Sequence, residues 1–135
     1  MHTSDITDMT SGVPKVIDPS THAILDYVTA GTFLAMGFGM LNRNRKAANL
    51  AFCNGLAVLG LSLMTDYPGG VFRTISFKTH GVIDVLQAGM SALGPALLGF
   101  AREPEAQFFH AQAAVEAGVV ASTDWNGTSM RQVAA

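Results

Sequence analysis

Long apolar stretches separated by short polar turns set the pattern of this chain. The stretches 27–42, 47–64 and 85–101 contain no Asp, Glu, Lys or Arg. A membrane-spanning helix needs about 17–25 predominantly apolar residues. A soluble four-helix bundle would instead need a polar face on each helix, and the first three of the expected helices have almost none. The pattern therefore predicts four membrane-spanning helices, near residues 21–41, 46–65, 79–101 and 104–124.

The helices are predicted to come in two similar pairs. The run Thr-His-Ala-Ile-Leu-Asp at 21–26 returns as Thr-His-Gly-Val-Ile-Asp at 79–84, which is 58 positions later. The same offset relates Thr65-Asp66 to Thr123-Asp124. We predict an all-α fold, a four-transmembrane-helix bundle made of two tandem two-helix repeats with parallel pseudo-two-fold symmetry. The expected segments are a flexible N-terminal tail (1–20), a first repeat (21–67), an interfacial connector (68–78), a second repeat (79–125) and a C-terminal tail (126–135).

Composition supports a membrane setting and excludes some partners. Charged residues make up 13% of the chain, against roughly 25% in soluble domains. The formal net charge of −2 gives no reason to expect nucleic acid as a partner. The single cysteine, Cys53, excludes a disulfide within one chain. The expected partners are the lipid bilayer and other membrane-protein subunits, or a second copy of the chain.

Histidines and aspartates are expected to gather at one membrane face. Each two-span unit returns the chain to the side on which it began, so the starts of the first and third helices should lie near the ends of the second and fourth. His and Asp four positions apart also share one helix face. The predicted polar cluster consists of His22, Asp26, Asp66, His80, Asp84 and Asp124. Its structural interpretation is that the helix dipole favours acidic residues near helix starts, and that the His–Asp pairs there tighten the interface between helices. The alternative is a metal or haem site that uses His22 and His80.

Two ionisable residues are expected inside the membrane. Glu116 and His110 both lie in the fourth predicted span. Ionisable groups at that depth are costly and are functional by default, so Glu116 suggests a small transporter or a proton path as a further alternative. The spacing from Ala106 to His110 is similar to that of pigment-binding helices in light-harvesting polypeptides. No cofactor is the leading expectation, with haem or a pigment as alternatives.

Small residues are expected to mediate helix packing. Gly31, Ala35 and Gly39 lie four apart in the first span, and Gly55 and Gly60 lie in the second. Small residues at such spacing let helix backbones approach closely in lipid.

Short motifs around the helix ends carry a family resemblance. Thr-Asp-Tyr-Pro-Gly at 65–69, Thr-His-Gly at 79–81 and Thr-Asp-Trp at 123–125 resemble small bacterial four-helix membrane proteins near the SPW-repeat type, over about residues 20–126. The resemblance implies a multi-pass protein of the bacterial inner (cytoplasmic) membrane and supplies no catalytic residues. The chain also lacks a phosphate-binding loop or a cysteine cluster. We therefore expect a small non-enzymatic integral membrane protein, which acts as an accessory or assembly subunit of a larger membrane complex or as a homo-oligomer.

Overall fold

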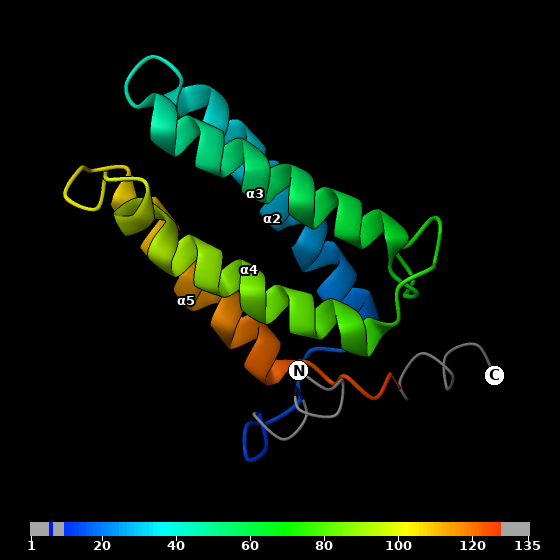
Figure 1. Cartoon of the computed structure of the whole chain (residues 1–135). Helices are drawn as coiled ribbons and strands as arrows, with labels where there is room; N and C mark the ends of the chain where they lie inside the picture. The colour runs from blue at the N-terminus through cyan, green and yellow to red at the C-terminus, as the bar shows by residue number, and fades with distance from the viewer. Residues whose placement is uncertain (1–5, 7–9, 128–135) are drawn as a thin grey trace.

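The computed structural model of the chain describes residue 6 and residues 10–127. Within these residues the fold is all-helical, as predicted, with the helices packed as two hairpins (Figure 1). The turns 41–44 and 98–105 lie at one end of the bundle, and the connector 65–76 lies at the other. The helices are α2 (Pro19–Met40), α3 (Arg45–Met64), α4 (Phe77–Leu97) and α5 (Ala106–Ser122).

Side-chain caps fix where the first helix of each hairpin begins. Asp18 accepts a hydrogen bond from the Thr21 N–H at 2.8 Å, and Ser76 accepts one from the Thr79 N–H at 3.2 Å. Each cap gives one otherwise unpaired helix-end donor a partner. The hydrogen bond from Thr21 also lowers the pKa of the Asp18 carboxyl below its ordinary value. The two caps begin α2 and α4 at positions 58 residues apart, so His22 and His80 both lie in the first turn of their helix.

Close helix contact within the first hairpin depends on glycine. A Cβ added at Gly37 would come within 2.8 Å of the Phe52 ring, and one added at Gly55 within 2.9 Å of Leu34. Gly55 therefore packs against α2 as expected. α2 packs on α3 and α4 on α5 along their lengths, whereas α3 and α4 meet at few positions.

The other small residues singled out in the sequence face away from the neighbouring helices. A Cβ added at Gly31, Gly39 or Gly60 would meet nothing within 4 Å, and Ala35 is exposed. Gly37, two positions from Gly39, makes the close contact to α3 instead. The expectation that these residues lie at helix contacts is therefore wrong within the described residues. A four-residue period identifies a narrow face of a helix but not whether that face turns inward.

Two of the four described helices satisfy the expectation of a membrane span by their own length and hydropathy. Among the described helices, α2 and α3 are long and apolar enough to cross a membrane. α4 contains His80, Asp84 and Gln87 in its first half, and α5 has 17 residues. Polar side chains lower the hydropathy of α4, and the 17 residues of α5 lie at the short limit for a span.

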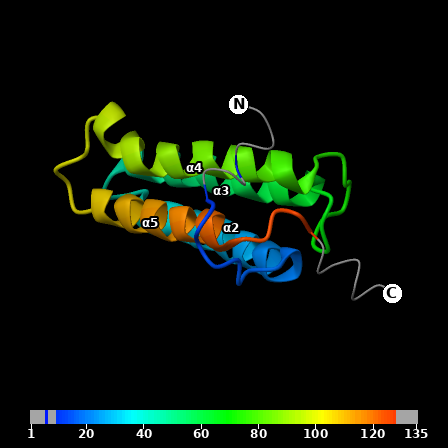
Figure 2. The same cartoon turned by 90° about the horizontal axis from the view of Figure 1, so that it is seen from below.

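The two ends of the bundle have different cores. Near the 41–44 and 98–105 turns the core is apolar and includes Phe33, Met40, Phe100 and Phe109. At the opposite end, Tyr67, Phe77 and Trp125 pack around the two histidines (Figure 2 shows the same hairpins from below).

Candidate functional site

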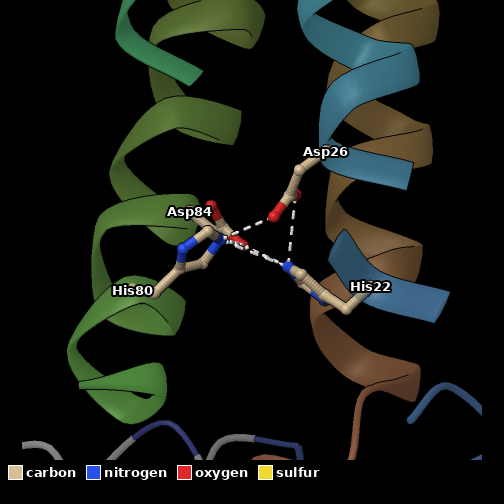
Figure 3. Close-up of side chains that lie close together, drawn as sticks. All are labelled: His22, Asp26, His80 and Asp84. Atoms are coloured by element: carbon tan, nitrogen blue, oxygen red, sulfur yellow. Dashed lines mark hydrogen bonds and ion pairs between the residues drawn. The ribbon is translucent and has the colours of Figure 1, made fainter. Parts of the chain in front are cut away.

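Four of the predicted polar residues meet in one buried cluster between α2 and α4. Figure 3 shows His22 and Asp26 reaching from α2 toward His80 and Asp84 of α4. The His22 and His80 side chains are 0% and 1% exposed. One nitrogen or oxygen atom from each of the four residues lies within 4.8 Å of the other three. We call these four residues the His–Asp centre.

The two imidazole rings point the same atom inward. The Nε2 atoms of His22 and His80 are 3.3 Å apart. His22 Nε2 lies 3.3 Å from Asp26 Oδ1 and 3.1 Å from Asp84 Oδ2. His80 Nε2 lies 3.1 Å from Asp26 Oδ2 and 3.2 Å from Asp84 Oδ2. Two nitrogens and two carboxylates therefore enclose one small volume.

Two threonines determine which ring nitrogen carries the proton. Thr123 Oγ1 lies 2.6 Å from the Val119 carbonyl oxygen, and Thr65 Oγ1 lies 2.6 Å from that of Leu61. A carbonyl oxygen cannot donate, so each hydroxyl gives its single hydrogen to the carbonyl. Each hydroxyl must then accept from the histidine Nδ1 beside it.

These contacts join His22 to Thr123 at 2.9 Å and His80 to Thr65 at 2.7 Å. Nδ1–H is therefore the protonated position in both rings. In a neutral imidazole the other nitrogen, Nε2, then carries a lone pair that points into the centre.

Backbone bridges hold both threonines at the ends of their helices. Thr65 pairs with Ile75, and Thr123 pairs with Ile17, each in a parallel bridge. The Asp66 N–H donates to the Ile75 carbonyl at 2.7 Å, and the Asp124 N–H donates to that of Ile17 at 2.8 Å. The chain entering each first helix thus ties down the end of a second helix, which fixes the hydroxyls against the rings.

A tyrosine supports one of the carboxylates. The Tyr67 hydroxyl donates to Asp26 Oδ2 at 2.7 Å. Burial and the nearby Asp26 charge raise the pKa of the Tyr67 phenol above its ordinary value, so it stays a donor at physiological pH. The residue 58 positions later is Trp125, whose indole N–H donates to the Val120 carbonyl at 2.9 Å instead. Trp125 therefore gives Asp84 no hydrogen bond like the one that Tyr67 gives Asp26.

Aromatic rings cover the imidazole side of the centre. The His22 ring lies edge-on to Phe77 at 5.3 Å and to Trp125 at 4.9 Å between ring centroids. Trp125 rests against Gly81, where an added Cβ would come within 2.9 Å of the indole. Only a glycine at this position lets the indole lie directly on α4, which keeps this side of the centre apolar.

The inward atoms need positive charge among them. With both rings neutral, two nitrogen lone pairs and two carboxylates would face one another with no donor among the four groups. Two arrangements resolve this repulsion: protonation of both Nε2 atoms, or a divalent cation held by all four groups. In either case the two carboxylate charges are balanced, as burial requires.

A small, partly open cavity adjoins the carboxylate side. It has a volume of about 30 Å³. Asp26 and Asp84 line it together with Gln87 and Glu116. Glu116, in the middle of α5, accepts hydrogen bonds from the Ser91 hydroxyl at 3.2 and 3.4 Å. The expected intramembrane carboxyl is thus inside the bundle and bonded to α4.

The remaining predicted site residues lie outside the His–Asp centre. Asp66 is exposed, and Asp124 is half-buried with its carboxylate accepting from the Asn126 N–H at 3.1 Å. His110 is exposed on α5. The prediction that all six polar residues form one cluster is therefore correct for four of them.

The residues that the sequence patterns did not reveal are the ones that orient the side chains of the His–Asp centre. Thr65 and Thr123 were visible as half of the repeated Thr-Asp pair, but the aspartate was the expected participant. A helix that ends at the threonine turns its hydroxyl inward and sends the following aspartate outward. Tyr67 could not be found by spacing, because its partner Asp26 lies 41 positions away.

Comparison of the chain with protein-family models, with curated proteins and with solved structures finds no match. The resemblance to proteins near the SPW-repeat type therefore stays a prediction, and the site must be interpreted from its own geometry.

Proposed function

We propose that this chain is a multi-pass protein of the bacterial inner membrane whose His–Asp centre binds one divalent transition-metal ion. The observation that carries the proposal is the pair of threonine contacts that fix Nδ1–H in both histidines. Outer hydrogen bonds of this kind are typical of metal-binding histidines, because they set the tautomer and hold the ring in place.

The distances suit a tetrahedral ion. Zinc lies about 2.0–2.1 Å from imidazole nitrogen and about 2.0–2.2 Å from carboxylate oxygen, so ligand atoms around it lie about 3.3–3.5 Å apart. The five separations that include a histidine nitrogen, 3.1–3.3 Å, approach these values, and all four ligand atoms lie within 4.8 Å of one another. Imidazole with carboxylate favours Zn²⁺, Fe²⁺ or a similar ion over Mg²⁺ or Ca²⁺, which prefer oxygen alone.

The charges suit a dry environment. Two neutral imidazoles, two carboxylates and one divalent ion sum to zero. A neutral site avoids the cost of an unbalanced charge near the membrane interior. Metal binding would also replace four mutually repelling groups by four bonds, so it should stabilise the packing of α2 against α4.

The membrane setting is supported by the outer surface of the bundle. α2 and α3 have the length and hydropathy of spans. Large apolar side chains are also exposed on every helix, among them Phe38, Leu56, Leu93 and Val115. With α4 and α5 as additional spans, the tandem two-helix symmetry would place the His–Asp centre near one membrane face, on the pseudo-two-fold axis.

A haem fits this centre less well than an ion. Two axial histidines must lie on opposite sides of the porphyrin plane. Here the two Nε2 atoms are 3.3 Å apart and carboxylate oxygens lie beside them. That arrangement leaves no space for a macrocycle between the rings.

Metal titration of the full chain tests the proposal. The protein is purified in mild detergent, stripped with a chelator and titrated with Zn²⁺ against a chromophoric competitor. We expect one ion per chain. His80→Ala should abolish binding, whereas His110→Ala, which removes an exposed histidine from the same bundle, should leave it unchanged.

A carboxylate pair gives a second matched comparison. Asp84→Asn should weaken Zn²⁺ binding strongly, and Asp66→Asn should not. Circular dichroism confirms that each variant stays helical. A folded wild-type chain that takes up neither Zn²⁺ nor Fe²⁺ would overturn the proposal and leave two imidazolium–carboxylate pairs as the structural interpretation.

A role as an assembly subunit or homo-oligomer is compatible with metal binding. The observation that favours it is the outward Gly31–Ala35–Gly39 face of α2, which no helix of the described chain covers. Small residues at this spacing are typical of close helix contacts between chains in membranes. Purification in mild detergent tests this candidate, since a strictly monomeric particle with no co-purifying subunit would contradict it.

A further inference from the structure

The cavity beside the His–Asp centre is large enough to be occupied. A volume of about 30 Å³ exceeds the roughly 10–15 Å³ needed for one water molecule. All four helices contribute to its walls. The lining residues are Leu25, Asp26, Thr29, Val58, Asp84, Gln87, Val115, Glu116 and Val119.

Gln87 supplies a donor with no acceptor. Its Nε2 is buried and makes no hydrogen bond among the described residues. Buried amide groups normally have partners, because an unpaired donor costs about 1–3 kcal/mol. A molecule in the cavity that carries a lone pair would satisfy this group.

Gln87 also borders a groove on the outside of the bundle. The groove lies between α3 and α4, where the hairpins touch at few positions, and measures about 300 Å³. Its other lining residues are Leu50, Cys53, Asn54, Ala57, Ile83, Leu86 and Met90. Leu86 is 66% exposed and Met90 49%, so in a membrane the groove would open toward lipid. Gln87 therefore stands between a lipid-facing groove and the cavity at the carboxylates.

We propose that the metal in the His–Asp centre takes a small uncharged molecule, of the size of a diatomic gas, as a fifth ligand on its carboxylate side, and that this molecule enters from lipid through the α3–α4 groove past Gln87. This inference rests on the proposed metal-binding function. Such molecules concentrate in the apolar phase that the groove faces, and Gln87 lines both the groove and the cavity.

The surroundings select for size and charge. The centre is neutral with its metal bound, so a small anion would add an unbalanced charge to an apolar interior. The cavity volume excludes a ring or a chain. On the opposite side, Phe77 and Trp125 cover the His22 ring, so the carboxylate side is the open approach.

Nitric oxide binding to the iron-loaded protein tests the inference. The full chain is placed in lipid nanodiscs without oxygen, loaded with Fe²⁺ and exposed to NO, and the iron–nitrosyl signal is measured by electron paramagnetic resonance. We expect a signal close to the iron content, which His80→Ala removes. Azide, a small anion, should not compete.

The outcomes separate this inference from the proposed function. Iron that is bound but gives no nitrosyl signal overturns the inference and leaves metal binding intact. A chain that takes up no iron also overturns it, and the Zn²⁺ titration then decides whether the proposed function fails as well.

Two matched pairs of variants test the route. Ala57→Trp fills the groove and should slow NO binding several-fold in stopped-flow measurements, whereas Leu56→Trp, on the same helix but outside the groove, should not. Gln87→Leu should speed NO release by about fivefold, the equivalent of one hydrogen bond. Gln107→Leu, which removes an exposed glutamine of α5, is its control. Equal binding rates in both tryptophan variants would overturn the groove as the entry.

Discussion

The two hairpins share the residues that form the His–Asp centre and differ in those that form the cavity beside it. His22, Asp26 and Thr65 each have an identical residue 58 positions later. At the same offset, however, Thr29 corresponds to Gln87 and Val58 to Glu116. The cavity therefore receives its amide and its third carboxyl from the second hairpin alone.

One further pair shows how the difference is accommodated. Phe33 is fully buried in the apolar core near the turns, and the corresponding Ser91 is fully buried as a donor to Glu116. The first hairpin uses these positions for packing, and the second uses them for polar contacts. Both hairpins therefore contribute the residues of the His–Asp centre, whereas the second hairpin adds the polar residues of the cavity. Each set can be altered without the other.

Replacing the threonines should have the largest effect, because it acts on the shared part. Thr65→Val and Thr123→Val keep the side-chain shape but remove the acceptors for Nδ1–H. Loss of such outer contacts typically lowers metal affinity about 10–100-fold, and the double variant should lose more than either single one. Zn²⁺ competition titrations measure this. Thr32→Val is the control, since its hydroxyl bonds only to the Val28 carbonyl of its own helix.

A large loss for one threonine and none for the other would break the equivalence of the two hairpins. It would show that a single histidine holds the ion and that the second merely fills space. The expected result is a similar loss for both, because their contacts to the rings are 2.9 and 2.7 Å long.

Tyr67→Phe should have the next largest effect, because it removes a contact that the second hairpin lacks. A hydrogen bond to a charged group contributes about 1.5–3 kcal/mol. The free energy of unfolding of the metal-free protein should fall by about that amount. Tyr27→Phe is the matched control, since its hydroxyl donates to the Gly69 carbonyl at the margin of the bundle. Equal losses in both variants would show that Asp26 does not depend on Tyr67.

The sequence was sufficient to predict the four helices and the four residues of the His–Asp centre. Long apolar stretches located all four helices, three of them through charge-free runs, and the repeated His-x-x-x-Asp located the four residues that meet. Both signals are local, since they depend on hydropathy and on the helical period. The offset of 58 positions added the expectation that the two His-Asp pairs face each other.

The orienting contacts and the cavity depended on packing that periodicity does not encode. Whether Thr65 or Asp66 faces inward is decided by the residue at which α3 ends. That the hydroxyl of Tyr67 reaches Asp26 depends on how the connector folds back over α2. The outward position of Gly31, Ala35 and Gly39 similarly depends on the rotation of α2, which Gly37 and Phe52 set.

Glu116→Val should have a smaller effect and of the opposite sign, because it gives α5 the residue of the first hairpin. Removing a buried carboxyl with an incomplete set of partners should raise the free energy of unfolding by about 1–2 kcal/mol. Zn²⁺ affinity should not change, since Glu116 is not part of the His–Asp centre. Denaturant unfolding in detergent measures the stability, with Glu116→Gln as the control that keeps an acceptor for Ser91. A fall in Zn²⁺ affinity would instead make Glu116 a fifth member of the centre.

Substitutions on the outward face of α2 should have the smallest effect on the single chain. A side chain added at Gly31 or Gly39 meets nothing within 4 Å, so Gly31→Leu should change the free energy of unfolding by no more than about 0.5 kcal/mol. If this face contacts a second chain, the same variant should shift the particle in mild detergent toward the monomer. Gly118→Leu, on α5 and equally free of neighbours, is the control for added bulk. Size-exclusion chromatography with light scattering measures the mass. An unchanged oligomer in Gly31→Leu would assign this face to lipid.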